Sequence, residues 1–260
     1  MKIPIFQVDA FNTELFKGNP AAVCPLAEWL PDEILQKIAS ENNLSETAFF
    51  VKENSKYSIK WFTPLSEVDL CGHATLATAH VLFNHLNYPD QTISFSSLSG
   101  ELLVNRQDNN LIFLDFPSQP PRPIPLDKVY LTAFGIQPIA AFKAKKLMLV
   151  FKNEEEVLNL EPDFSQIINL DPLGVIATAK GEKYDFVSRF FAPAVGINED
   201  PVTGSAHTTL IPYWSDLTGK EQLIAWQCSK RGGVLYCKNH KERVLIGGHA
   251  VTFLEGTINL

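Results

Sequence analysis

Apolar and polar residues alternate along much of this chain with the period of two that is typical of β-strands. In the first half, this alternation and a β-type composition predict strands at 3–8, 47–51, 57–62, 92–96, 101–106 and 111–116. In the second half, we expect strands near 138–143, 146–152, 173–179, 184–192, 222–227, 233–238, 243–248 and 250–258. The pattern therefore predicts a strand-rich protein with few helices.

Three segments break the alternation and predict helices. Residues 31–40 have acids in the first turn and apolar residues at 34, 35 and 38, which is typical of a surface helix. Residues 72–84 are apolar almost all round and rich in small side chains, so this helix should be buried inside a sheet. Residues 204–217 have a similar composition, and Pro212 should kink the helix that they form.

The second buried helix belongs to a longer internal similarity, which has a constant shift of 132 residues. The equivalent positions are Gly72 and Gly204, His73 and Ser205, Gly100 and Gly232, and 111–114 and 243–246. A register that is kept from a helix start to a later hairpin predicts two lobes with the same chain path. We expect an α+β fold of two pseudo-symmetric lobes, each a mostly antiparallel sheet curled around a central helix, with a cleft between them.

A proline-rich segment marks the boundary between these lobes. Residues 117–125 contain five prolines in nine positions, and proline has no backbone N–H for a helix or a central strand. The sequence therefore predicts a first lobe at 1–116, an extended linker at 117–125 and a second lobe from 126 to 249.

Composition narrows the class of protein. An apolar content of 45% and a charged content of 20% fit a globular chain, and the net charge of −7 argues against a nucleic-acid partner. No apolar run reaches the ~18 residues of a membrane span. The four cysteines are scattered and form no C-x-x-C pair, which favours the cytoplasm over a disulfide framework or a zinc site.

Both buried helices begin at a glycine. A helix start has unpaired N–H groups and a partial positive charge, and glycine lets a ligand approach that backbone closely. Gly72 and Gly204 could therefore hold a substrate carboxylate from two sides. The alternative is that Asp69 and Asp200 are ordinary N-caps and that the glycines are turn residues.

Two further side chains could carry chemistry. His73 lies in the first helical turn, where burial and the helix N-terminus should lower its pKa, so a neutral ring could pass a proton. Glu46 lies at the mouth of an apolar strand, and a carboxylate held against apolar walls can act as acid or base near neutral pH. The alternatives are a hydrogen-bonded core histidine and a solvated loop acid. His80 and His207 are assigned to packing or to an interface.

Cys71 could act as a thiolate, because helix starts lower the pKa of a thiol. A two-thiol racemase would need a second cysteine at the matching entrance, where Val202 and Thr203 stand instead. A metal site formed by Cys71, His73 and a nearby aspartate lacks standard spacing, so no metal is predicted. The sequence has no phosphate-binding loop, dinucleotide fingerprint or G-x-S-x-G elbow, and no cofactor is predicted.

Four motifs together resemble the PhzF family of phenazine-biosynthesis-like proteins. They are Gly-Asn-Pro-Ala-Ala-Val at 18–23, Leu-Ser-Glu-Thr-Ala-Phe at 44–49, Leu-Cys-Gly-His-Ala-Thr at 70–75 and Asp-Pro-Val-Thr-Gly-Ser-Ala at 200–206. The resemblance implies the diaminopimelate-epimerase fold, in which residues 250–260 would return to the first lobe. It also implies a general acid/base at Glu46 and further active-site positions at His73, Asp200 and Ser205.

The function predicted from these observations is a cofactor-independent isomerase acting on a small carboxylate-bearing metabolite. Gly72, His73, Gly204 and Ser205 would bind the carboxylate, Glu46 would move the proton, and His73 and Asp200 would orient the substrate or relay the proton. A non-catalytic small-molecule-binding protein and a Cys71-dependent epimerase or hydrolase are the alternatives. The family resemblance suggests a homodimer; neither nucleic acid nor membrane is expected as a partner.

Overall fold

The computed structural model describes residues 1–53 and 56–260 and has the α+β class that the sequence predicts. The chain divides into two compact units, one formed by residues 1–115 with 247–260 and the other by residues 116–246. Each unit has its own succession of paired strands and its own buried helix. No helix in the described part of the chain is long and apolar enough to span a membrane.

The first unit is built on a sheet in which β1 pairs with both β17 and β2. Parallel pairing of β2 with β3 and antiparallel pairing of β3 with β4 continue the sheet, and β6, β7 and β8 complete it beyond β4. The strands are β1 (Lys2–Ala10), β2 (Asn19–Leu26), β3 (Glu46–Glu53), β4 (Lys56–Phe62), β5 (Glu67–Val68), β6 (Thr92–Ser97), β7 (Gly100–Arg106), β8 (Ile112–Pro117) and β17 (Ala250–Asn259).

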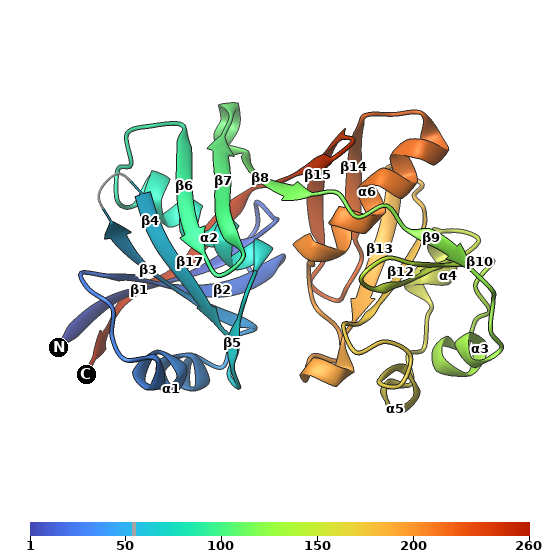
Figure 1. Ribbon diagram of the computed structural model, residues 1–260, viewed down its shortest axis with the longest axis horizontal. Coiled ribbons are helices and arrows are strands. Elements are labelled where there is room, and N and C mark those ends of the chain that lie inside the picture. The colour runs from blue at the N-terminus through green and yellow to red at the C-terminus, as the bar shows by residue number, and fades with distance from the viewer. Residues whose placement is uncertain (54–55) are drawn as a thin grey trace. The chain divides into compact units, whose positions relative to one another are not determined.

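Two helices belong to this sheet (Figure 1). Helix α2 (Gly72–Asn84) packs against β1, β2, β3 and β17, and ten of its thirteen residues are buried. Its apolar surface on all sides is what the sequence pattern predicts for an enclosed helix. Helix α1 (Asp32–Asn42) has a single buried face, which carries Leu35, Ile38 and Ala39.

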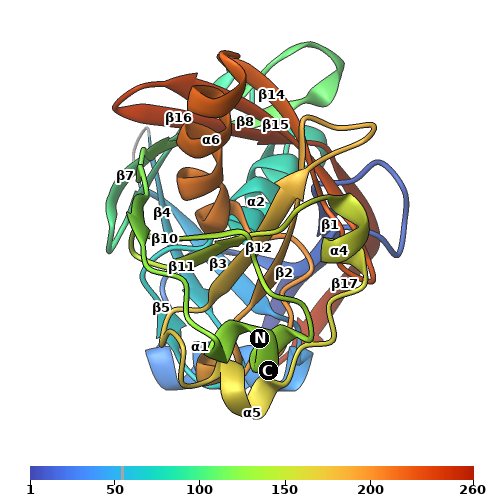
Figure 2. The ribbon, with the colours of Figure 1, turned by 90° about the vertical axis from the view of Figure 1, so that its right-hand side faces the viewer.

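The two ends of the chain meet in the first unit. β17 runs antiparallel to β1, with Lys2 opposite Asn259, and the terminal residues Met1 and Leu260 extend this pairing through their backbones. Figure 2 shows the N and C labels side by side at this point. The last strand therefore belongs to the same sheet as the first.

The second unit contains the remaining strands. Its strands are β9 (Arg122–Ile124), β10 (Ala140–Lys143), β11 (Leu147–Val150), β12 (Val175–Lys180), β13 (Phe186–Phe191), β14 (Gln222–Gln227), β15 (Gly233–His240) and β16 (Arg243–Gly248). β9, in the proline-rich segment, pairs antiparallel with β10, with Pro123 opposite Phe142. Such an edge position suits proline, which has no N–H to offer a second neighbour.

The same succession of pairings occurs in each unit. From β1 to β7 the pairs are antiparallel, parallel, antiparallel, parallel and antiparallel, with β5 as a short side branch on β4. From β10 to β15 the succession is the same. In both units the buried helix lies in the chain between the two strands of the fourth pair: α2 between β4 and β6, and α6 between β13 and β14. This shared order supports the internal duplication. That the two units arose from one ancestral unit stays a prediction.

Helix α6 (Gly204–Thr218) is the buried helix of the second unit and continues through Pro212. Proline at this position cannot donate to the carbonyl of Thr208, four residues earlier. The backbone N–H of Gln119 donates to that carbonyl instead, at 2.9 Å. The proline-rich segment thus satisfies the acceptor that Pro212 leaves open.

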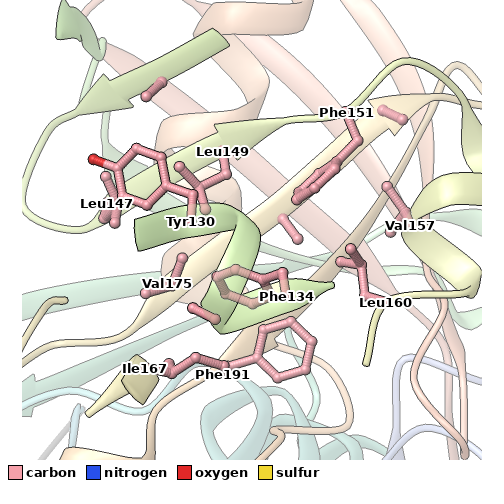
Figure 3. Packing of buried hydrophobic residues seen from close by; sticks show 14 of the residues in the cluster. Tyr130, Phe134, Leu147, Leu149, Phe151, Val157, Leu160, Ile167, Val175 and Phe191 are labelled. Atoms are coloured by element: carbon pink, nitrogen blue, oxygen red, sulfur yellow. The ribbon is translucent and has the colours of Figure 1, made fainter. Parts of the chain in front are cut away.

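The short helices of the second unit are α3 (Val129–Phe134), α4 (Glu154–Leu158) and α5 (Phe164–Ile167). They cover a cluster of buried side chains that includes Phe134, Phe151 and Phe191 (Figure 3). Phe134 contacts both other rings, with centroids 6.3 Å and 5.6 Å apart. Aromatic pairs at these distances add to the stability that burial alone gives.

The sequence pattern missed several elements. Strands β2, β5 and β9 and helices α3, α4 and α5 were not predicted. They are short or, in β2, carry prolines at Pro20 and Pro25, and β9 lies in the segment that was predicted only as an extended linker. The equivalent hairpin glycines Gly100 and Gly232 both have positive φ, of 95° and 66°. The four cysteines are free and buried, as their spacing indicates.

Candidate active site

In the first unit, three segments that are distant in sequence begin close together. Asn19 is the first residue of β2, Glu46 is the first residue of β3, and Gly72 is the first residue of α2. Parallel pairing of β2 and β3 places Ala21 opposite Glu46. Cys71 is the N-cap of α2, and no side chain caps the helix among the described residues, so the N-cap alternative for Asp69 is not what the structure shows.

The side chains at this point form one buried group. Oε2 of Glu46 lies 3.1 Å from Nε2 of His73, and these side chains are 12% and 6% exposed. Glu46 is therefore not a solvated loop acid. Neither atom has a well-aligned hydrogen-bond partner among the described residues, although each is shielded from solvent. The Glu46 carboxylate and the His73 ring are close but do not satisfy each other's hydrogen-bonding capacity. Both can therefore form a hydrogen bond with a substrate atom.

The other nitrogen of the His73 ring faces different partners. Nδ1 lies 3.2 Å from the amide nitrogen of Asn19 and 3.5 Å from Sγ of Cys71. Asn19 is completely buried. The group thus runs from sulfur and amide through the imidazole to the carboxylate.

Two pKa expectations from the sequence are wrong. Burial raises the pKa of the Cys71 thiol to about 11, an effect to which the Glu46 carboxylate adds, so the helix start does not make a thiolate here. Burial lowers the pKa of His73, but Cys71 and Glu46 outweigh it and hold that pKa well above its ordinary value. Sequence reasoning missed this because it did not place an acid beside the ring.

Ligand atoms of Glu46, Cys71 and His73 all lie within 4.8 Å of one another. Thiolate, imidazole and carboxylate are ligands that zinc accepts. However, the sulfur faces Nδ1 and the carboxylate faces Nε2, whereas a single ion binds one nitrogen of a histidine ring. The arrangement therefore resembles a chain of proton-exchanging groups more than the coordination shell of one ion.

The start of α6 in the second unit has different surroundings. Thr203 is the N-cap, and no side chain caps this helix in the described part of the chain. Asp200 accepts a hydrogen bond from the Thr203 hydroxyl, so it holds the loop before the helix without acting as an N-cap. The completely buried Gln227 accepts from the Thr203 backbone N–H at 2.8 Å and donates to the Asp200 carbonyl at 2.8 Å.

A lysine lies beside this second helix start. Nζ of Lys146 is 3.2 Å from Oγ of Ser205, and burial, with Lys145 nearby, lowers the lysine pKa. Neither Lys146 nor Gln227 was predicted as a site residue from the sequence, because a surface-type lysine cluster or a single glutamine beside a strand carries no motif. Asn19 belongs to the Gly-Asn-Pro-Ala-Ala-Val motif at 18–23, but its contact with His73 is visible only in the structure.

The structure thus brings Glu46, Gly72 and His73 together in the first unit. It places Asp200, Gly204 and Ser205 together in the second unit. That both groups serve one substrate stays a prediction.

A family model described as phenazine biosynthesis-like protein, PhzC-PhzF, matches residues 8–256. The chain belongs to this family. Over its whole length it is 51% identical to all of an uncharacterized isomerase from Pseudomonas aeruginosa. It is also 50% identical to a crystal structure of a PhzF-family protein from Enterococcus faecalis, which superposes over 100% of both chains with a TM-score of 0.98.

A more distant structure shares the fold. A hydroxyproline epimerase from Agrobacterium vitis matches 99% of this chain and 92% of its own with a TM-score of 0.59, at 9% identity. This similarity concerns the fold alone. The fold class inferred from the sequence, with its epimerase-like relatives, is confirmed, and the family is one in which relatives are named isomerases.

Proposed function

We propose that this protein is a cofactor-independent isomerase that moves a proton within a small carboxylate-bearing metabolite, with Glu46 as general acid and base. The observation that carries the proposal is the buried contact of 3.1 Å between Glu46 and His73 beside the start of α2. Names of relatives support an isomerase and leave the substrate open.

The proton transfer needs no other reactant. Glu46 takes a proton from an activated carbon of the substrate, and the electrons of the broken C–H bond stay on the substrate skeleton. The protonated Glu46 then returns a proton to another carbon or to the other face, which restores its carboxylate. The negative charge that develops is stabilised by donors fixed in advance, here the backbone N–H groups of Gly72 and His73 at the helix start.

The proposed roles in the second unit concern binding. Backbone N–H groups at Gly204 and Ser205 would hold a carboxylate, and Asp200 would orient the substrate. The hydrogen bonds from Gln227 and Thr203 to the Asp200 loop support this assignment, because they fix the position of the helix start.

Deuterium incorporation tests the proposal. Candidate amino acids and unsaturated carboxylates are incubated with the protein in heavy water, and wash-in is followed by mass spectrometry. Glu46→Gln should slow exchange by ~10²- to 10⁴-fold, the usual contribution of a general acid or base. Glu53→Gln, an exposed change at the other end of β3, is the matched control and should leave exchange unchanged.

A thiol route is the second candidate, favoured by the distance of 3.5 Å between Cys71 Sγ and His73 Nδ1. The raised thiol pKa of about 11 weighs against it, because a nucleophilic thiolate is scarce at neutral pH. Exchange that is lost in Cys71→Ser and kept in Glu46→Gln would replace the proposal by this route. Saturable binding of a carboxylate without exchange in any variant would indicate a binding protein.

A further inference from the structure

Asn19 owes its position to a turn that only glycine permits. Gly18 has a φ of +67°, and a Cβ atom there would lie 2.1 Å from the carbonyl oxygen of Ala10. β2 starts immediately afterwards, with Asn19 opposite Ala10 in the pairing with β1. The turn thus delivers the Asn19 amide into the interior, against a ring that is 54 residues away in sequence.

The amide determines which nitrogen of His73 carries the proton. An amide NH₂ group is only a donor, so a ring nitrogen that faces it must accept. The Asn19 amide nitrogen lies 3.2 Å from Nδ1, and the thiol of Cys71 is a second donor 3.5 Å from the same atom. With Nδ1 as acceptor, the proton of the neutral ring lies on Nε2, 3.1 Å from the Glu46 carboxylate.

We propose that Asn19 is a positioning residue that holds His73 in the tautomer with its proton on Nε2, the ring nitrogen that lies 3.1 Å from the Glu46 carboxylate. This inference rests on the proposed function for its catalytic meaning. In the other tautomer the Nε2 lone pair would face the carboxylate oxygen at the same short distance. Glu46 would then have to be protonated to make a favourable contact, and it could no longer take a proton from substrate.

Asn19 also opposes a second proton on the ring. That proton would sit on Nδ1 and point at the amide donor. The charged or titratable groups acting on the ring are Cys71 and Glu46, one at each nitrogen. Cys71 and Glu46 favour the charged ring, whereas burial and the Asn19 amide disfavour it, and the balance among them sets how readily His73 gains and loses a proton.

Nuclear magnetic resonance of ¹⁵N-histidine-labelled protein tests the tautomer without any substrate. Long-range ¹H–¹⁵N spectra distinguish protonated from unprotonated ring nitrogens, and the His73 signals are assigned by their loss in His73→Gln. At a pH above the ring pKa, we expect a protonated Nε2 and an unprotonated Nδ1. A neutral ring with its proton on Nδ1 would overturn the proposal, and this wild-type result decides even if no variant folds.

Two variants of nearly the same shape extend the test. Asn19→Asp replaces the donor by an acceptor, so we expect Nδ1 to become protonated and the ring to titrate at higher pH than in the wild type. Asn19→Leu should give a mixture of tautomers. Asn42→Leu is the control, because the Asn42 amide donates to Thr47 at 3.1 Å and has no part in the His73 contacts. Ring signals that are the same in all three variants would contradict the proposal.

Activity gives a second readout. If exchange is found, Asn19→Leu should lower kcat by at least about tenfold and leave KM unchanged, since the altered group acts on Glu46 and not on substrate binding. A rise in KM at constant kcat would instead assign Asn19 to binding. If exchange is not found for the wild type, the proposed function fails while the tautomer assignment is still decided by the spectra.

Discussion

The starts of α2 and α6 occupy the same place in the pairing order of their units, yet different groups surround them. At α2, an acid, an imidazole, a thiol and an amide contact one another within a buried cluster. At α6, the acid Asp200 is bonded to Thr203, and the buried Gln227 ties the loop together. The same strand order therefore carries side chains that can exchange protons at the start of α2 and side chains that fix the backbone at the start of α6.

The difference is a matter of which neighbour each helix start has. Glu46 lies beside α2 because β3 begins there. Asp200, the acid before α6, instead accepts a hydrogen bond from Thr203 within its own loop. We therefore expect substitutions near α2 to change proton transfer and substitutions near α6 to change loop stability and binding. Four predictions, in order of decreasing effect, test this division.

Gly18→Ala should cause the largest loss of stability. The added Cβ would meet the Ala10 carbonyl oxygen, a backbone atom, and the residue has positive φ. Strain and overpacking together should cost roughly 3–5 kcal/mol in the free energy of unfolding, measured by urea denaturation. Gly219→Ala, also at positive φ but with open space around it, should cost only about 1 kcal/mol. Equal losses would contradict the role given to the β1–β2 turn.

Gln227→Leu should destabilise the second unit. It removes the partners of the Thr203 N–H and the Asp200 carbonyl, which are both held at 2.8 Å. Losing these two buried hydrogen bonds should cost about 2–4 kcal/mol. Denaturation measures the loss, and amide hydrogen exchange should localise it to the loop before α6. Faster exchange at the start of α2 instead would contradict the division between the two units.

Acid should destabilise the fold through the histidine of α6. Burial lowers the pKa of His207 to about 4, so the folded state keeps the ring neutral while the unfolded state takes up a proton below about 6.5. Stability present above pH 6.5 should therefore be lost as the pH falls towards 4, by up to about 3 kcal/mol. His80 on α2, with a pKa lowered to about 4 by burial and by His85, adds to this loss.

The sign is opposite for His73. Its raised pKa means that the folded state holds the proton more tightly, so its contribution is present at low pH and is lost as the pH rises through that pKa. Unfolding curves at several pH values separate these contributions when His207→Asn is compared with the exposed control His240→Asn. An unchanged acid dependence in His207→Asn would refute the assignment.

Lys146→Met should have the smallest effect. The Lys146 ammonium lies beside Ser205 and has a pKa lowered by burial, so an apolar chain of similar length should change stability by less than about 1 kcal/mol. Loss of the positive charge should raise KM for a carboxylate substrate about tenfold at constant kcat. Lys145→Met, at the exposed neighbour, is the control. A fall in kcat would mean that this end of the second unit takes part in the chemistry.

Much of the fold could be predicted because it follows from local patterns. The bounds of α2 were predicted to the residue, since an apolar surface on all sides and a glycine at the start are both visible in the sequence. β2 was not predicted because it contains two prolines, which are unusual in a strand that pairs with a neighbour on each side, here β1 and β3. Helices α3 to α5 have too few residues to show a period.

The sequence predicted which residues belong to the candidate site, but it did not predict the pKa values of their side chains. Motifs pointed to Glu46 and His73, but the raised pKa of the ring depends on a contact between two segments that the sequence does not place. The same holds for Cys71, whose burial outweighs the helix start. Asn19, Gln227 and Lys146 act through distant partners, and a single sequence gives no sign of such pairs.

The most direct measurement of the central claim is deuterium exchange into a bound substrate for the matched variants Glu46→Gln and Asp200→Asn. Glu46→Gln should slow exchange by ~10²- to 10⁴-fold, whereas Asp200→Asn should keep the rate of exchange at saturating substrate and raise KM. Exchange that persists in Glu46→Gln and disappears in Asp200→Asn would contradict the assignment of proton transfer to the start of α2.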